Sequence, residues 1–357
     1  MTDQIARIAA GGGALVGLGY LARRTIRRRR RWSFTGRTVV ITGGSRGLGL
    51  EIARLVGGEG AHVVLLARDR DELDRAAAEL GDRGVAADAY ICDVTDRQTV
   101  QDVITVVHHR TRRLDAIFNV AGIVQVGPLE TMDLEDFRRA MDVHFWGSLH
   151  TVWAALPILR RQGYGRIVNI SSVGGRVAVP HMAPYCASKF ALTGLSDALR
   201  AELAQDGIRV TTVTPGLMRT GSHVNAQFKG DRSRESAWFS VLAASPLTSA
   251  SARRSARRIV EAARHGDPAL TITVQARMLV AANALVPGLT AWGMRQGNRI
   301  LPEAAGDGGG GDGGGDREDG RESRPASEQR SRSTPSVLTW LADRAARRNN
   351  ELGGATG

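Results

Sequence analysis

Short apolar runs recur along residues 37–275, and longer stretches with helical periodicity separate them. Several runs are rich in Val and Ile and lack polar alternation, which is typical of strands that are buried on both faces. Each gap is long enough for the crossover that a parallel pair of strands requires. The predicted strands are Thr38–Thr42, His62–Leu66, Ala86–Ile91, Leu114–Val120, Arg166–Ile170, Arg209–Val213 and Leu270–Val274. The pattern therefore predicts an α/β fold with a doubly wound parallel sheet of about seven strands.

Residues 1–36 form a separate segment before this domain. Residues 5–22 are apolar except for Arg7, and as a helix they would reach about 27 Å. The arginine-rich run 23–31 follows directly, whereas a secretory signal carries its charge before the apolar stretch. This order predicts membrane association through residues 5–31, with the basic flank on the cytoplasmic side. A loose helix on the catalytic domain and a flexible basic tail are the alternatives.

The chain after the domain divides into three segments. Residues 276–303 are apolar and predicted to be helical, with a break at Pro287-Gly288. Residues 304–335 are rich in Gly, Asp, Arg, Ser and Glu, bury almost nothing and are predicted to be disordered. Residues 336–357 are predicted to form a short amphipathic helix and a tail. That helix either docks on the main domain, binds a partner or simply ends the chain.

Charge and cysteine content narrow the class of protein. The net charge is +12, but the basic residues are nearly all Arg and their excess is concentrated in the run 23–31. No zinc-finger spacing and no aromatic-rich basic stretch is present, so no nucleic-acid partner and no metal site are predicted. The two cysteines, Cys92 and Cys186, lie in predicted core segments and fit a reducing compartment, which predicts a cytoplasmic location.

A glycine-rich turn follows the first predicted strand and precedes a helix. Its sequence is Gly43-Gly44-Ser45-Arg46-Gly47-Leu48-Gly49. A helix N-terminus offers N–H groups and a positive dipole end to a pyrophosphate, and glycine lets the backbone approach it closely. With Thr42 in front, the spacing is TGxxxGxG, which resembles the short-chain dehydrogenase/reductase family over residues 37 to 275. This resemblance implies a Rossmann-like sheet and a nicotinamide dinucleotide.

The end of the second strand indicates which dinucleotide is used. In relatives that use NAD, an acidic residue holds the ribose hydroxyl here, and this chain has Ala67 at that position. Arg68 and Arg46 supply two guanidiniums instead, and these suit a 2′-phosphate. Asp69 is a competitor that could reach the ribose. We therefore expect NADP(H) as the cofactor.

Further segments resemble cofactor-contacting elements of the family. Asp93-Val94 resembles the pair at the adenine, and Asn119-Val120-Ala121-Gly122 resembles the NNAG element with Val120 in place of its second Asn. Pro215-Gly216 and Thr220 resemble the PGxxxT segment beside the nicotinamide. The resemblance assigns cofactor binding to Gly43, Ser45, Arg46, Gly47, Leu48, Gly49, Arg68, Asp93, Val94, Asn119, Ala121, Gly122, Tyr185, Lys189, Pro215, Gly216 and Thr220.

Tyr185 and Lys189 form a YxxxK motif, and Ser172 lies thirteen residues before the tyrosine. This Ser-Tyr-Lys spacing resembles the family's catalytic signature. Hydride transfer to a carbonyl builds negative charge on oxygen, so a proton donor must stand beside it. A cation one helical turn away is expected to lower the pKa of the tyrosine, and a serine hydroxyl can stabilise the developing charge. Tyr185 is therefore predicted to act as acid/base, with Lys189 and Ser172 assisting it.

His144 occupies the position at which relatives carry an Asn that helps to relay protons to the lysine. A neutral histidine both donates and accepts, so His144 is predicted to be a catalytic residue in that relay. The alternative is a packed side chain with the relay routed elsewhere.

The predicted activity is interconversion of a carbonyl and a secondary alcohol on a small hydrophobic molecule, lipid, steroid or acyl-like. The substrate class rests on apolar residues in the lid, 221–248, which include Phe228, Trp238 and Phe239, and on the predicted membrane segment. The resemblance also implies a homodimer or homotetramer. The alternatives are a non-catalytic NADP-binding sensor or scaffold, an interaction protein that acts through its tails, and a nucleotide-sugar epimerase.

Overall fold

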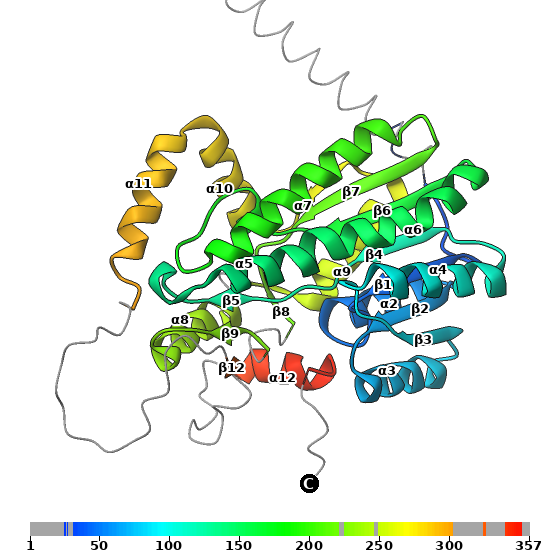
Figure 1. Cartoon of the computed structure of the whole chain (residues 1–357), viewed down its shortest axis with the longest axis horizontal. Coiled ribbons are helices and arrows are strands. Elements are labelled where there is room, and N and C mark those ends of the chain that lie inside the picture. The colour runs from blue at the N-terminus through cyan, green and yellow to red at the C-terminus, as the bar shows by residue number, and fades with distance from the viewer. Residues whose placement is uncertain are drawn as a thin grey trace, which may run out of the picture.

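Seven parallel strands form one sheet in the order β11-β7-β6-β4-β1-β2-β3 (Figure 1). The computed structural model describes residues 25, 27, 31–220, 225–245, 249–302, 324–325 and 340–351. The order changes direction between β1 and β4, so the sheet is doubly wound, as predicted. The strands are β1 (Thr38–Thr42), β2 (His62–Ala67), β3 (Ala87–Ile91), β4 (Ala116–Asn119), β6 (Gly165–Ile170), β7 (Ile208–Thr214) and β11 (Ala269–Thr271).

Helices cover both faces of the sheet because successive strand residues point to opposite sides. Val39 and Ile41 face one core with α2, α3 and α9, and Val40 faces the other with α4, α6 and α7. All three β1 side chains are completely buried, which explains why the strand shows no polar alternation. The covering helices are α2 (Gly47–Gly57), α3 (Arg70–Asp82), α4 (Arg97–Thr111), α6 (Gly147–Gln162), α7 (Ala183–Glu202) and α9 (Ala252–His265).

Smaller elements surround the carboxyl edge of the sheet. Two of them are minor sheets, ordered β12-β9-β5 and β10-β8. Helix α5 runs into the π-turn η2, which leads directly into α6. Their bounds are β5 (Gln125–Val126), η1 (Leu129–Thr131), α5 (Leu134–Met141), η2 (Asp142–Trp146), η3 (Val173–Gly175), β8 (Leu217–Arg219), β9 (Gln227–Phe228), α8 (Arg232–Ala244), β10 (Ser249–Ser251), α10 (Val274–Leu285), α11 (Pro287–Asn298), β12 (Arg324–Pro325) and α12 (Trp340–Arg348).

The predicted strands are confirmed, with the third, the fourth and the last of them shorter than expected. The fourth strand begins at Ala116, and the side chain of Asp115 just before it accepts from the backbone N–H of Thr38 on the neighbouring strand. The last strand ends at Thr271 because Thr273 accepts a hydrogen bond from the N–H of Ala276 and thereby caps α10.

The segments outside the sheet differ in how far the structure describes them. Pro287 begins α11, so the predicted break after the first C-terminal helix is present. Of residues 304–335, which are predicted to be disordered, the structure describes only Arg324–Pro325. This pair forms a short strand that pairs with β9. The predicted apolar stretch 5–22 lies outside the described residues. Among the helices that are described, none is long and apolar enough to span a bilayer.

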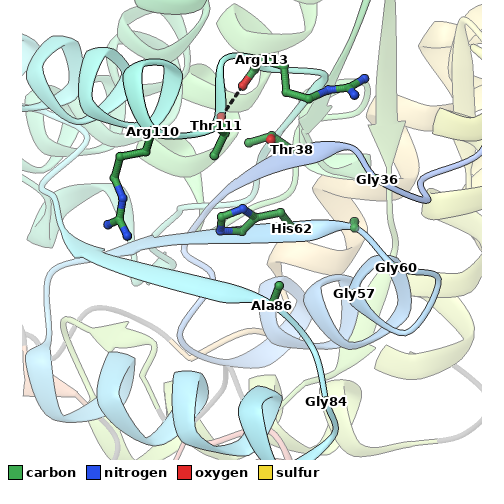
Figure 2. Close-up of a pocket in the computed structure, with 11 residues that line it drawn as sticks. Gly36, Thr38, Gly57, Gly60, His62, Gly84, Ala86, Arg110, Thr111 and Arg113 are labelled. Carbon is green, nitrogen blue, oxygen red and sulfur yellow. Dashed lines mark hydrogen bonds between the residues drawn. The ribbon is translucent and has the colours of Figure 1, made fainter.

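A cavity lies at the amino ends of β1 and β2, away from the carboxyl edge (Figure 2). Its polar side chains are engaged with neighbours: His62 with Asp88 at 3.2 Å, and Arg113 with Asp115 at 2.6 Å. The cavity is lined by Gly36, Thr38, Gly57, Gly60, Ala61, His62, Gly84, Ala86, Arg110, Thr111 and Arg113. It gathers no set of side chains with an evident reaction.

The carboxylate of Asp115 links three groups at the amino ends of β1 and β4. Its fully buried carboxylate accepts from Arg37 Nη1 at 2.8 Å, Arg113 Nε at 2.6 Å and the N–H of Thr38 at 2.9 Å. Burial by itself would raise the pKa of Asp115, but the hydrogen bonds from Arg113, Thr38 and Arg37 together hold it below its usual value. The folded state therefore gains stability from the ionised carboxylate above the ordinary Asp pKa and loses it as the pH falls through the depressed value.

We expect Asp115→Ala to lower the free energy of unfolding by about 3 kcal/mol, because it leaves two guanidiniums and a strand N–H without their acceptor. Urea unfolding followed by circular dichroism measures this change. The matched control is Asp206→Ala, which removes an exposed partner of Arg160 and should cost less than about 1 kcal/mol. Equal losses in the two variants would contradict the central role of Asp115.

Candidate active site

The site lies where β1, β4, β6 and β7 end side by side. The register pairs Thr42 with Asn119, Asn119 with Asn169, and Asn169 with Thr212. Because all four strands run parallel, the loops that follow them meet at one edge. The loops that carry the predicted cofactor and catalytic residues are thus brought together by strand pairing.

The glycine turn after β1 has the backbone that its sequence predicts. Gly43 and Gly47 have φ angles of +63° and +55°, which side-chain-bearing residues rarely adopt. A Cβ on Gly43 would lie 2.9 Å from the backbone N of Ala121, so the turn and the loop after β4 are in close contact. Gly47 is the first residue of α2, and Arg46 before it makes no side-chain cap. The first amides of α2 therefore remain available to an acceptor outside the helix.

Oxygen acceptors from the end of the chain lie at this turn. The carbonyl of Asn349 accepts from the N–H of Gly47 at 2.8 Å, and a carboxylate oxygen of Glu351 would lie 2.5 Å from a Cβ on Gly47. These oxygens occupy the place at which a phosphate oxygen would be bound by a helix N-terminus. The residues present therefore fit a dinucleotide phosphate.

The residues that are predicted to select NADP lie at the rim of the turn. Arg46 Nη1 is 3.1 Å from Glu72 Oε1, and the hydroxyl of Ser45 donates to Glu72 Oε2 at 2.9 Å. Arg68 is exposed, and its Nη1 is 3.9 Å from Asp93. Asp69, the competing carboxylate, accepts from the N–H of Glu72 and caps α3.

Four other predicted cofactor residues have mainly structural contacts. The amide of Asn119 donates to Asn169 at 2.8 Å and accepts from Thr151 at 2.6 Å, so this side chain is held within the domain. Leu48 and Val94 are buried, and the carboxylate of Asp93 accepts from the backbone and hydroxyl of Thr95. Contact with a cofactor from Asn119 would have to come from its main chain.

Tyr185 and Lys189 lie one turn apart on α7, and Ser172 follows β6. The amino group of Lys189 donates to the carbonyl of Ile170 at 2.9 Å and lies 5.8 Å from the centroid of the tyrosine ring. Ser172 accepts from the N–H of Gly174 at 3.1 Å and also hydrogen-bonds Tyr185. The structure thus brings the three predicted groups to one place.

Burial controls the protonation of both groups on α7. It raises the pKa of Tyr185 to about 12, against the opposing effect of the hydrogen bond with Ser172. It lowers the pKa of Lys189 to about 7. The expected lowering of the tyrosine pKa by the lysine is not seen in this state of the site, because loss of water disfavours the phenolate more than the neighbours favour it.

His144 lies on the π-turn η2, a distortion that often marks functional positions. Its Nε2 accepts from the N–H of Ile123 at 3.1 Å, and its Nδ1 is 2.7 Å from the hydroxyl of Ser188, which in turn donates to the carbonyl of Tyr185. This pattern requires a neutral ring with the proton on Nδ1. Burial, followed by the charge of Lys189, holds the pKa of His144 well below its usual value. Both nitrogens are engaged, so the predicted relay role requires one of these bonds to open.

The segment after β7 closes the other side of the site. The carbonyl of Pro215 accepts from the N–H of Val173, and Gly216 packs against Thr273. Thr220 is buried, and its carbonyl accepts from the side chain of Asn349 at 3.1 Å. This segment therefore lies close both to the loop that carries Ser172 and to Asn349.

The apolar lid residues divide into two groups. Phe228 and Phe239 pack with Val126 and Ala226 in a small core of their own, whereas Val241 and Leu242 are exposed. Two of the aromatic residues that favoured an apolar substrate are thus ordinary core residues.

Several site residues were not identified from the sequence. Ser188 lies inside the YxxxK motif, but its spacing gives no sign that it pairs with His144. Glu72 is an ordinary first-turn acid of α3, and only the fold places it beside Ser45 and Arg46. For Glu351, the one available signal was the amphipathic pattern before it, which left docking on the main domain as one of three alternatives.

Comparison with known proteins agrees with this geometry. The family model described as short chain dehydrogenase matches residues 37–229. Dehydrogenase/reductase SDR family member 7B of Danio rerio is 34% identical over 236 residues, which cover 64% of this chain and 75% of that protein. A short-chain dehydrogenase from Streptomyces avermitilis superimposes with a TM-score of 0.62 and 28% identity, over 74% of this chain and 99% of that one. A gluconate 5-dehydrogenase from Burkholderia cenocepacia J2315, in complex with NADP and tartrate, gives 0.61 and 27%, over 70% of this chain and 98% of that one.

The pKa of Lys189 can be measured directly because the chain contains lysine only at positions 189 and 229. With ¹³C-labelled lysine, we expect two side-chain signals in the protein without cofactor, one of which is absent from Lys189→Arg. That signal should titrate near pH 7, because burial lowers the pKa of Lys189 to about 7. A midpoint above pH 9 would show that the amino group keeps its water.

Proposed function

We propose that this chain, which belongs to the short-chain dehydrogenase/reductase family, interconverts a carbonyl and a secondary alcohol with NADP(H). Its membership supports an oxidoreductase that binds a nicotinamide cofactor. The observation that carries the proposal is the convergence of Tyr185, Lys189 and Ser172 beside the glycine turn. A purely structural role for α7 would not require the buried amino group of Lys189 one turn from the buried phenol of Tyr185.

Each of these three groups has a defined part in the proposed reaction. The cofactor supplies or accepts the hydride. The hydroxyl of Tyr185 gives its proton to the substrate oxygen during reduction and recovers it during oxidation. Ser172 donates a hydrogen bond to the same oxygen and stabilises the negative charge that develops there. Lys189, which the carbonyl of Ile170 holds in place, supplies the positive charge that favours loss of the tyrosine proton.

Two features support NADP(H) over NAD(H). Ala67 replaces the acidic residue at the end of β2, and Asp69 is engaged as the cap of α3. Arg46 and Arg68 place two guanidiniums at the rim of the turn, where a 2′-phosphate would be neutralised. The gluconate 5-dehydrogenase of similar fold was solved with NADP.

The substrate is proposed to be a small hydrophobic carbonyl or alcohol compound. Exposed Val241 and Leu242 on α8 support this, while Phe228 and Phe239 no longer do. Membrane association through residues 5–31, a cytoplasmic location and a homodimer or homotetramer stay predictions. A non-catalytic NADP-binding sensor is the second candidate, but the intact Ser, Tyr and Lys argue against it.

We expect Tyr185→Phe to lower kcat about 100- to 10,000-fold, because the proton donor is lost while the ring remains. Turnover of a panel of apolar ketones is followed by NADPH absorbance. Tyr90→Phe is the matched control, since it removes a phenol hydroxyl that accepts a hydrogen bond from Arg110 on the surface. Near-normal turnover by Tyr185→Phe would refute the mechanism. If the unmodified chain and the variant both bind NADPH but neither turns over any ketone, the non-catalytic sensor is favoured.

The cofactor preference has its own test. Arg68→Ala should weaken NADPH binding about tenfold and leave NADH binding unchanged, because only NADPH carries the phosphate that a guanidinium neutralises. Fluorescence titration gives both dissociation constants. Arg83→Ala removes an exposed arginine from the far end of α3 and should change neither. Equal weakening for the two cofactors would exclude Arg68 as a phosphate ligand.

A further inference from the structure

The end of the described chain packs against the proposed cofactor site. Helix α12, red in Figure 1, lies beside β8 and α8, and residues 349–351 continue from it toward the glycine turn. The described domain therefore includes a segment that is separated from it by more than thirty residues of sequence, from 303 to 339.

This segment hydrogen-bonds backbone groups of the glycine turn and of the segment after β7, among them the N–H of Gly47. The main-chain carbonyl of Asn349 accepts from the N–H of Gly47 at 2.8 Å, and the side-chain amide of Asn349 donates to the carbonyl of Thr220 at 3.1 Å. The amide of Asn350 donates to the carbonyl of Ser45 at 2.9 Å. The segment thus joins the glycine turn to the segment after β7.

Glu351 extends this contact with a buried carboxylate. The residue is 7% exposed, and its Oε2 accepts from the amide of Asn225 at 2.6 Å. Arg46 Nε lies 3.6 Å from the same oxygen. The carboxylate therefore lies between the first residue of α2 and the guanidinium that is proposed to bind the 2′-phosphate.

Arginines of the domain anchor the segment through its last helical turn. Arg54 donates to the carbonyl of Arg348 at 2.9 Å and to the side chain of Asn349 at 3.3 Å. Arg75 donates to the side chain of Asn350 at 2.9 Å. Cations at the carbonyl end of a helix satisfy its last acceptors and its dipole, so these contacts favour the docked state.

We propose that residues 340–351 form an autoinhibitory segment that occupies the phosphate side of the cofactor site. The proposal rests on the proposed function, because it requires the dinucleotide to bind along the glycine turn. The N–H of Gly47 has one proton to donate and cannot serve Asn349 and a phosphate oxygen together. The segment must leave before the cofactor binds, and the apparent affinity falls by the fraction of molecules in which it is docked.

The sequence between the domain and α12 favours such competition. Residues 304–335 are predicted to be disordered, although Arg324–Pro325 among them pairs with β9, and a disordered tether holds its end at an effective concentration of about millimolar. Docking is then intramolecular, so even weak contacts occupy the site until cofactor displaces them.

The docked state should also depend on pH through Glu351. Burial raises the pKa of this carboxyl to about 7, against the charge of Arg46 and together with that of Glu72. Other charged groups beside the segment are Glu51 and Arg54 on α2, which face Arg348 and Asn349, and Arg75 on α3, which faces Asn350. The docked carboxyl holds a proton that the free carboxyl releases, so docking weakens as the pH rises from about 4.5 to about 7.

Cofactor titrations test the proposal with the full chain, with Glu351→Ala in the full chain, and with a chain that ends at residue 335. We expect the shortened chain to bind NADPH about tenfold more tightly than the full chain at pH 6, with a smaller difference at pH 8. Glu351→Ala should recover part of this gain, and exposed Arg347→Ala, the matched control on α12, none. Comparing the two chains at each pH cancels titration of the cofactor itself.

Hydrogen exchange supplies an independent measurement on the full chain. Saturating NADPH should speed exchange of the amides of residues 340–351, because the segment is released, while the amides of β1 become no less protected. Equal affinities for the two chains, weaker binding by the shortened chain, or greater protection of residues 340–351 would each overturn the inference while leaving the proposed function intact. Absence of NADPH and NADH binding by both chains would instead refute the proposed function, and the inference with it.

Discussion

The hydrogen bond from the Lys189 amino group to the Ile170 carbonyl fixes the site on which the rest of the structure depends. It joins helix α7 to the carboxyl end of β6 at 2.9 Å. Tyr185 comes from the helix and Ser172 from the loop after that strand, so this bond, together with those from Ser171 to α7, sets their relative positions. Strand register then places the glycine turn and the loop after β4 beside them. The site is thus held together where helix α7 meets the carboxyl end of strand β6.

The same burial that strengthens this bond also shifts the pKa values of Tyr185 and Lys189 away from those of the free side chains. It raises the pKa of Tyr185 to about 12 and lowers that of Lys189 to about 7. A neutral phenol and a partly neutral amine are therefore the stable forms before the cofactor arrives. His144 is held neutral for the same reason, and its two hydrogen bonds join the loop at Ile123 to α7 through Ser188. When bound, an oxidised nicotinamide would bring a positive charge that favours the phenolate of Tyr185.

On the phosphate side of the site, the chemistry depends on backbone N–H groups that lack a hydrogen-bond acceptor within their own helix. The first amides of α2 have no partner within their helix, and Arg46 does not cap them with its side chain. Asn349 and Glu351 meet this need with oxygens of the chain itself. A site built to attract phosphate oxygens will also attract a carbonyl and a carboxyl group that are tethered nearby. Competition between tail and cofactor therefore follows from the same chemistry that makes the turn a phosphate site.

The sequence by itself determined the fold class and singled out Ser172, Tyr185 and Lys189 as the candidate catalytic residues. Buried parallel strands carry uninterrupted apolar runs, and the glycine turn and the Ser-Tyr-Lys spacing are local patterns that a chain displays before it folds. Only the tertiary structure decided what lies opposite these residues. Glu72 beside Arg46, Ser188 against His144, the packed Phe228 and the docked Glu351 all depend on contacts between segments far apart in the chain. The sign of the tyrosine pKa shift was set in the same way, because it depends on how much water the assembled walls exclude and not on the distance to Lys189 alone.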